Sequence, residues 1–76
     1  MRIQLESTDK IVSLNGVPAR IWEGATLSGV PIHCYITRIA VDEGRPQEEF
    51  EQFERELQEC RKPSPAVAAI PMSMIL

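Results

Sequence analysis

The only histidine of the chain, His33, directly precedes Cys34, so the sequence contains the two residue types of a cysteine–histidine catalytic pair. Such a pair works only when the imidazole lies within hydrogen-bond reach of the thiol. Both residues belong to a stretch with the alternation of a β-strand, in which neighbouring side chains point to opposite faces. We therefore predict no catalytic pair here and interpret Cys34 as a small buried residue of the core.

The second cysteine, Cys60, falls on the apolar side of a predicted C-terminal helix, so we expect it to be buried near Cys34. A structural zinc site takes four ligands, and His33 on the opposite face leaves too few. We predict neither a metal site nor a cofactor, and we expect both thiols to react slowly in the folded chain. Two cysteines are also too few for a disulfide scaffold, which favours reduced thiols and a cytoplasmic location.

Carboxylates are concentrated in the same predicted helix, residues 47–61. Catalytic carboxylates need a cleft in which different surroundings push their pKa values apart, and one exposed helix offers none. We interpret these glutamates as a solvated surface and, because no other catalytic set is assembled, we predict that the chain is not an enzyme. Six glutamates spread around the polar side: Glu48, Glu49, Glu51, Glu54, Glu56 and Glu59.

An apolar stripe predicts this helix. Phe50, Phe53, Leu57 and Cys60 are spaced so that they lie along one side. Pro46 suits the first helical position, and two prolines after residue 62 end the helix. We expect the stripe to pack across the inner face of a sheet.

A short repeat predicts the turns of that sheet, because L-N-G-V-P at residues 14–18 returns as L-S-G-V-P at residues 27–31. Glycine accepts the positive φ of a tight turn, and the residue before proline is extended. Duplication and two turns independently solved by the same residues both explain the repeat. Asn15-Gly16 is a strong signal for a two-residue hairpin turn, which sets the register. The expected pairs are Leu14 with Val17, Val12 with Ala19, and Lys10 with Ile21.

Four strands are predicted, at residues 2–6, 10–14, 17–22 and 30–41, with a turn at 7–9 and a loop at 23–29. The fold class is α+β: an antiparallel meander of about four strands with one C-terminal helix packed on one face, followed by an apolar tail. Residues 1–62 form the domain and residues 63–76 the tail. The predicted inner face consists of Val12, Leu14, Val17, Ala19, Ile21, Val30, Ile32, Cys34 and Ile36.

Basic and aromatic side chains alternate on the predicted outer face, which has three interpretations. Aromatic residues and arginine are enriched in protein interfaces. The apolar tail can instead fold back and cover this face. The third interpretation is single-stranded nucleic acid, with bases stacked on the aromatic rings and phosphates near the arginines. The outer face is predicted to carry Ile11, Arg20, Trp22, His33, Tyr35, Thr37, Ile39 and Val41.

Size and charge limit the functional classes. A chain of 76 residues allows one domain, which buries only about 60% of its unfolded surface, so oligomerisation would add needed stability. The net charge is −3, and residues 42–62 carry eight acidic against four basic residues, which argues against a generic nucleic-acid binder. No apolar run is long enough for a membrane span. The strand-like, acid-containing N-terminus does not resemble a signal peptide.

We therefore predict a small cytoplasmic interaction module that self-associates, with a dimer as the first expectation because two-fold symmetry is the commonest. An unidentified protein partner is a further possibility. The alternative is a module for single-stranded nucleic acid that uses Arg20, Trp22, His33, Tyr35 and Arg38. The residues predicted to form the protein interface are Trp22, Tyr35, Ile39, Met72, Met74 and Ile75.

Overall fold

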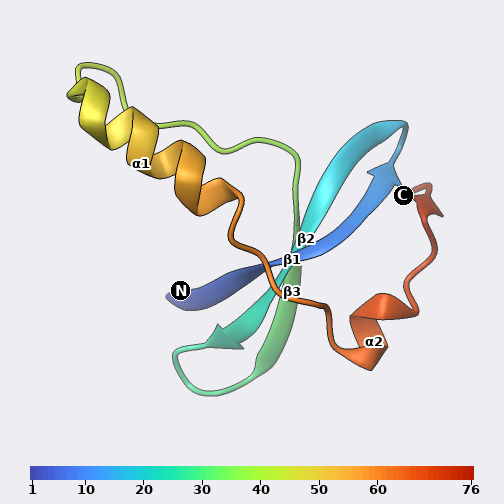
Figure 1. Ribbon diagram of the computed structural model, residues 1–76. Coiled ribbons are helices and arrows are strands. Elements are labelled where there is room, and N and C mark those ends of the chain that lie inside the picture. The colour runs from blue at the N-terminus through green and yellow to red at the C-terminus, as the bar shows by residue number, and fades with distance from the viewer.

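A long β-hairpin forms the centre of the molecule in the computed structural model, which describes residues 1–76 (Figure 1). Strand β1 (Ile3–Leu14) turns through Asn15 and Gly16 into β2 (Val17–Thr26). The turn residues have φ values of 51° and 83°, as a two-residue hairpin turn requires. Leu14 pairs with Val17 and Val12 with Ala19, so the predicted register is confirmed at this end.

Strand β1 is continuous, so the prediction of two strands with a turn at residues 7–9 is wrong. Ser7 pairs with Trp22 and Ile11 with Arg20, which leaves three residues of β1 opposite only Ile21. This bulge replaces the predicted pairing of Lys10 with Ile21. Within it Thr8 is fully buried, and its hydroxyl donates a hydrogen bond of 2.6 Å to the carbonyl oxygen of Ile21.

The α+β class is confirmed, and the sheet has four strands in the order β3-β2-β1-β4. Strand β3 (Pro31–Ile36) pairs antiparallel with β2 and ends well before the predicted residue 41. It ends just before its partner strand reaches Pro18, which has no N–H to donate to a ladder. Strand β4 (Ser73–Met74) comes from the C-terminal tail and runs parallel to β1, where an antiparallel fourth strand was predicted.

The two faces of β3 are the reverse of the prediction. Tyr35 lies opposite Ile21 and Cys34 lies opposite Trp22, and residues directly opposite each other share a face. Tyr35 therefore lies on the same side as the core, while Cys34 lies on the other side with Trp22. The predicted grouping of Trp22, His33 and Tyr35 on one outer face is wrong.

The C-terminal tail covers one face of the sheet. Helix α2 (Pro65–Ala68) places Val67, which is 3% exposed, against Val12, Ala19 and Ile21. Tyr35 and Ile70 pack against this cluster from its edges. We call the side that carries Val12, Ala19, Ile21 and Tyr35 the covered face, and the side that carries Ile11, Arg20, Trp22, Cys34 and Ile36 the open face. Residues 65–68 are therefore helical and pack on the sheet of their own chain.

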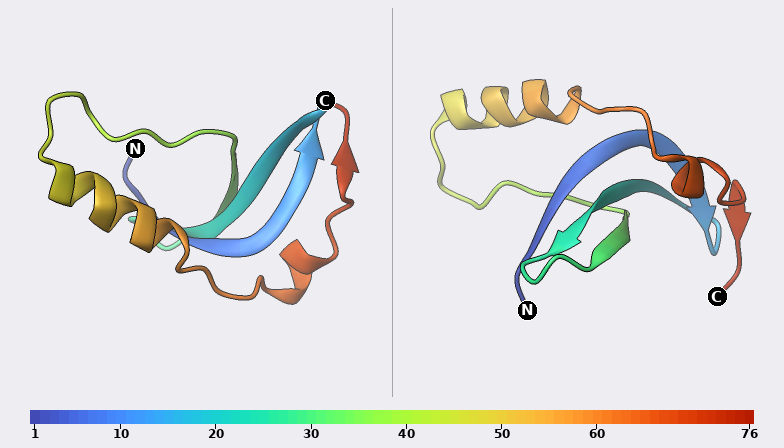
Figure 2. Two further views of the ribbon diagram at one scale, coloured as in Figure 1. Left: turned by 45° about the horizontal axis from the view of Figure 1, so that its top comes forward. Right: turned by 90° about the horizontal axis from the view of Figure 1, so that it is seen from below.

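Helix α1 (Gln47–Leu57) projects from the sheet as an arm, joined to β3 by a long connecting segment (Figures 1 and 2). None of its residues is buried, and it ends at Leu57, four residues before the predicted end. The prediction that it lies across the Val12–Ile21 face is wrong, because α2 occupies that face. Cys60, beyond the end of the helix, is exposed, so its predicted burial is also wrong. Neither helix has the length and apolarity needed to cross a bilayer.

Candidate protein-binding groove

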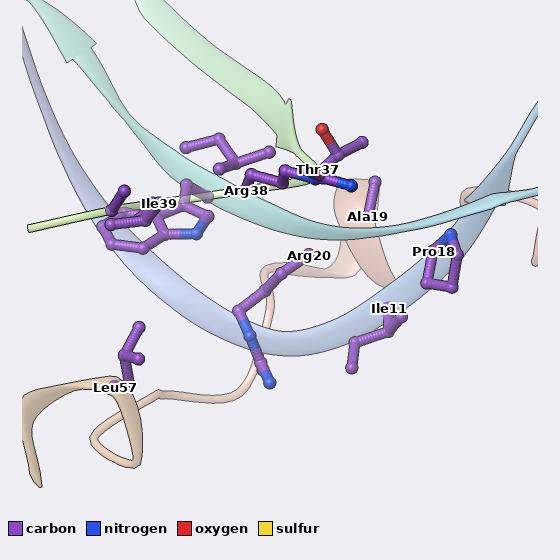
Figure 3. Close-up of a pocket in the computed structure, with 11 residues that line it drawn as sticks. Ile11, Pro18, Ala19, Arg20, Thr37, Arg38, Ile39 and Leu57 are labelled. Atoms are coloured by element: carbon purple, nitrogen blue, oxygen red, sulfur yellow. The ribbon is translucent and has the colours of Figure 1, made fainter. Parts of the chain in front are cut away.

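A groove with a volume of about 460 Å³ and a mostly apolar lining lies on the open face. It lies between strands β1 and β2, the end of β3 and the segment that follows it, and the last turn of α1. In Figure 3, Ile39 and Leu57 lie at one end of the groove, and Ile11 and Pro18 lie at the other. The lining residues are Ile11, Pro18, Ala19, Arg20, Trp22, Ile36, Thr37, Arg38, Ile39, Ala40 and Leu57.

Apolar side chains that remain accessible to solvent dominate the lining. Ile11, Ile39 and Leu57 are 43%, 41% and 40% exposed. Trp22, the only tryptophan of the chain, is half-buried and lines the groove with them. Contiguous apolar surface of this kind is uncommon on monomers and is typical of an interaction site.

The charged residues in the lining are both arginines. The guanidinium of Arg20 donates a hydrogen bond of 2.8 Å to the Thr8 carbonyl oxygen and lies 3.8 Å from the Cys60 sulfur. Arg38 is exposed and makes no ion pair or hydrogen bond through its side chain. The groove is therefore apolar with a positive rim, and Arg38 is its free charge.

The predicted interface residues are divided among three places. Trp22 and Ile39 line the groove together. Tyr35 lies on the covered face, where its hydroxyl is 3.2 Å from the His33 imidazole. Met74 pairs with Leu14 in the sheet, and the Met72 carbonyl oxygen accepts a hydrogen bond of 2.7 Å from the Ser13 N–H. Ile75 is 91% exposed and lies outside the groove.

The residues predicted for nucleic acid are also divided. Arg20, Trp22 and Arg38 line the groove, whereas His33 and Tyr35 lie on the opposite face of the sheet. The predicted platform of two stacked aromatic rings therefore does not exist, and one aromatic residue with two arginines remains.

Sequence reasoning missed a polar cluster that attaches the tail to the covered face. The buried carboxylate of Glu23 accepts a hydrogen bond of 2.9 Å from Arg61, and it also accepts bonds from the backbone N–H and the hydroxyl of Ser64. The Ser64 hydroxyl bond lowers the pKa of Glu23 below its usual value against the opposing effect of burial, with further help from the Ser64 N–H and Arg61. The glutamate lay within a predicted loop, so no pattern marked it as buried.

The side chains considered for catalysis or metal binding do not converge in the fold. His33 and Cys34 point to opposite faces, as predicted. Nowhere do three His, Cys, Asp or Glu side chains converge in a way that could hold a metal ion. The groove missed in the sequence includes Pro18, Ile36 and Leu57, and only Ile11, Arg20, Trp22, Thr37 and Ile39 were on the predicted outer-face list.

Comparison with known proteins gives no relative: the chain matches no protein-family model, no curated protein and no solved structure.

Proposed function

We propose that this chain is a non-enzymatic, cytoplasmic protein-interaction module that self-associates as a homodimer through its open face. The observation that carries the proposal is an excess of accessible surface. A folded monomer of 8.6 kDa exposes about 4,700 Å², and this chain exposes 5961 Å². The excess is about 1,300 Å², and a standard interface buries about 800 Å² of each partner.

The extended shape supports the same proposal. The radius of gyration is 13.9 Å, whereas a compact chain of 76 residues has a value of about 11.4 Å. The difference comes from the projecting arm of α1 (Figure 2). The last turn of this helix contributes Leu57 to the lining of the apolar groove. A second copy that covers both the helix and the groove would lower the accessible surface of each chain toward the value expected for a compact monomer of this mass. The two free cysteines are consistent with a reducing compartment.

Light scattering during size-exclusion chromatography, over a concentration series from about 1 to 500 µM, tests the proposal. We expect the mass to rise toward twice 8.6 kDa as the concentration increases. Ile39→Asp should hold the chain at the monomer mass, because residue 39 is exposed in the single chain and lines the groove. The matched control is Ile75→Asp, which is exposed outside the groove and should leave the dimer intact. A monomer mass at every concentration would contradict the proposal.

The single tryptophan gives a second readout of the same equilibrium. Trp22 lines the groove, so association should shift its fluorescence emission to shorter wavelength as water leaves its surroundings. Dilution should reverse the shift with the same midpoint that light scattering gives.

Single-stranded nucleic acid remains the second candidate, favoured by one observation, the meeting of Arg20, Trp22 and Arg38 in one groove. Stacking on one aromatic ring with two cations gives weak, salt-dependent binding. A gel shift with labelled oligonucleotides, at about 20 and 200 mM salt, tests it. A shift that is lost at high salt and in Arg38→Glu supports this function, and no shift at low salt excludes it.

A further inference from the structure

Helix α1 carries an apolar stripe that its own chain leaves half uncovered. Phe50 and Phe53 are both partly exposed, Leu57 is 40% exposed, and the helix has no buried residue. These three positions are separated by three and four residues, so they lie along one side of the helix. Only the C-terminal end of the stripe reaches the sheet, where Phe53 and Leu57 approach Trp22 and Ile39. An isolated helix of 11 residues is marginal in water, so α1 needs a surface to pack against.

The groove and α1 have complementary chemistry. The charged residues of the groove are the arginines Arg20 and Arg38, whereas α1 carries five glutamates and one arginine. Glu54 follows Phe50 by four residues, which places its carboxylate beside the apolar stripe. Neither Glu54 nor Arg38 has an ion-pair partner within the chain. A helix that laid its stripe in the groove would bring an unpaired carboxylate to an unpaired guanidinium.

We infer that the groove of each protomer receives helix α1 of a second copy, so that two chains exchange arms in a symmetric dimer. Phe50 and Phe53 of one copy fill the groove between Trp22 and Ile11 of the other, and Glu54 pairs with Arg38 across the interface. This inference rests on the proposed self-association and specifies its partner segment. The two-fold symmetry supplies the contact twice.

Charge reversal tests the exchange, because the pairing partners belong to different chains. In a homodimer of Arg38→Glu, both contacts place two carboxylates together, and in a homodimer of Glu54→Arg, both place two guanidinium groups together. Each variant alone should raise the dissociation constant of the dimer by about tenfold or more. An equimolar mixture of the two variants restores an opposite-charge pair at both contacts, so it should form a heterodimer close to the wild-type affinity. Light scattering on the variants and on the mixture measures this.

The matched control is Glu51→Arg, which makes the same charge change on the side of α1 away from the stripe and should leave the dissociation constant within about twofold. Recovery in the mixture, with loss in each single variant, supports the exchange. A third protein carries Arg38→Glu and Glu54→Arg in the same chain. If this double variant regains the wild-type dissociation constant but the mixture does not, the exchange is overturned in favour of α1 closing on its own groove. A dimer indifferent to both substitutions overturns the exchange but leaves self-association standing. A wild-type chain that stays monomeric overturns both.

Discussion

The covered and open faces belong to the same three strands, yet they differ in what lies on them. Along β2, Ala19 and Ile21 are 1% and 0% exposed beneath α2, while Trp22 on the other side is only half-buried. The larger apolar side chains of α1 leave the open face largely exposed, with only Phe53 and Leu57 near Trp22, whereas the smaller side chain of Val67 packs fully on the other face. Apolar area therefore does not decide which segment packs on this sheet.

The difference lies in polar anchoring. The segment around α2 is held at both ends by backbone hydrogen bonds to β1. Before α2, the Arg61 N–H donates to the Ser7 carbonyl oxygen and the Arg61 carbonyl oxygen accepts from the Asp9 N–H; after it, the Met72 carbonyl oxygen accepts from the Ser13 N–H. Glu23 adds bonds to Arg61 and Ser64. Helix α1 has no comparable bond to the sheet; its side-chain pairs, such as Arg45 with Glu49, are local. Directional bonds select the segment, and apolar contacts then stabilise it.

Truncation after Lys62 removes the segment that packs on the covered face and should lower the free energy of unfolding more than any other change considered. It removes the cover given by Val67 and Ile70, together with the Ser64 bonds to Glu23. Two buried apolar side chains and charge-assisted hydrogen bonds together predict a loss of more than about 4 kcal/mol in the free energy of unfolding. Circular dichroism and urea unfolding measure it. A truncated chain with unchanged stability would show that the open face, not the covered face, contains the core. The matched control is a truncation after Met74, which keeps β4 and should change stability little.

Ile21→Ala tests the same face within the sheet. Ile21 is fully buried, so its truncation should cost about 3 kcal/mol, within the range for buried isoleucine. Ile11→Ala on the open face is the matched control, because Ile11 is 43% exposed. At concentrations below those of the proposed dimerisation, it should cost less than about 1 kcal/mol in the free energy of unfolding. At concentrations where the proposed dimer forms, Ile11→Ala should weaken association instead. Equal losses from the two substitutions in dilute protein would contradict the distinction between the faces.

Glu23→Gln weakens the polar bonds that attach the tail to the sheet and leaves the apolar side chains on the covered face unchanged. We expect a loss of about 2 kcal/mol at pH 7, because charge-assisted hydrogen bonds become neutral ones. The pKa of Glu23 is lowered in the folded chain, so its contribution is complete above the usual value of 4.5 and disappears as the pH falls through the lower folded value. Urea unfolding at pH 7, 5 and 3 should show the wild-type advantage shrinking only at the lowest pH.

Glu49→Gln provides the control for this pH series. The Arg45 bond lowers the pKa of Glu49 too, but the pair is exposed on the arm, so stability should not change measurably. An advantage of wild type over Glu23→Gln that grew toward low pH would contradict the assigned sign.

Gly16→Ala gives the smallest expected effect and tests the turn on which the division into faces depends. Gly16 has a φ of 83° with nothing within 4 Å of an added Cβ, so the cost is backbone strain alone, about 1 kcal/mol. Gly44→Ala, at a φ of 79° in the loop before α1, has the same local strain but no role in strand register. Both should lower stability similarly, while only Gly16→Ala should disturb amide exchange along the hairpin. A larger loss from Gly44→Ala would mean that the arm contributes more to stability than the hairpin turn.

What the sequence predicted correctly was local. Asn15 and Gly16 specify their turn within two residues, so the pairs from Leu14 to Ala19 followed. The α+β class and most of α1 followed from periodicity in the same way. The faces of β3 did not, because they depend on the register between β2 and β3 and on the true length of β2.

Gly24 shows why the length of β2 was misjudged. Glycine between polar and small residues is typical of a loop, yet here it is a strand residue. A Cβ at this position would lie 1.8 Å from the Gln4 carbonyl oxygen, so only glycine allows the two strands to approach. The groove was missed for a related reason: Pro18, Ile36 and Leu57 come from three elements whose meeting is decided by the fold. Glu23 and Ser64 are 41 residues apart, beyond any local pattern.

The edges of the sheet limit how many chains can join through it. The outer edge of β1 is occupied by the tail of its own chain between residues 7 and 15, since Ser7 and Asp9 bond to Arg61 and Asn15 bonds to Met74. The outer edge of β3 pairs with no strand. A sheet with one blocked edge accepts one neighbour, so strand pairing through β3 ends at two copies and cannot propagate into a fibre. The tail thus prevents other chains from adding to β1. A chain without it would expose the edges of both β1 and β3, so that copies could add to the sheet on both sides.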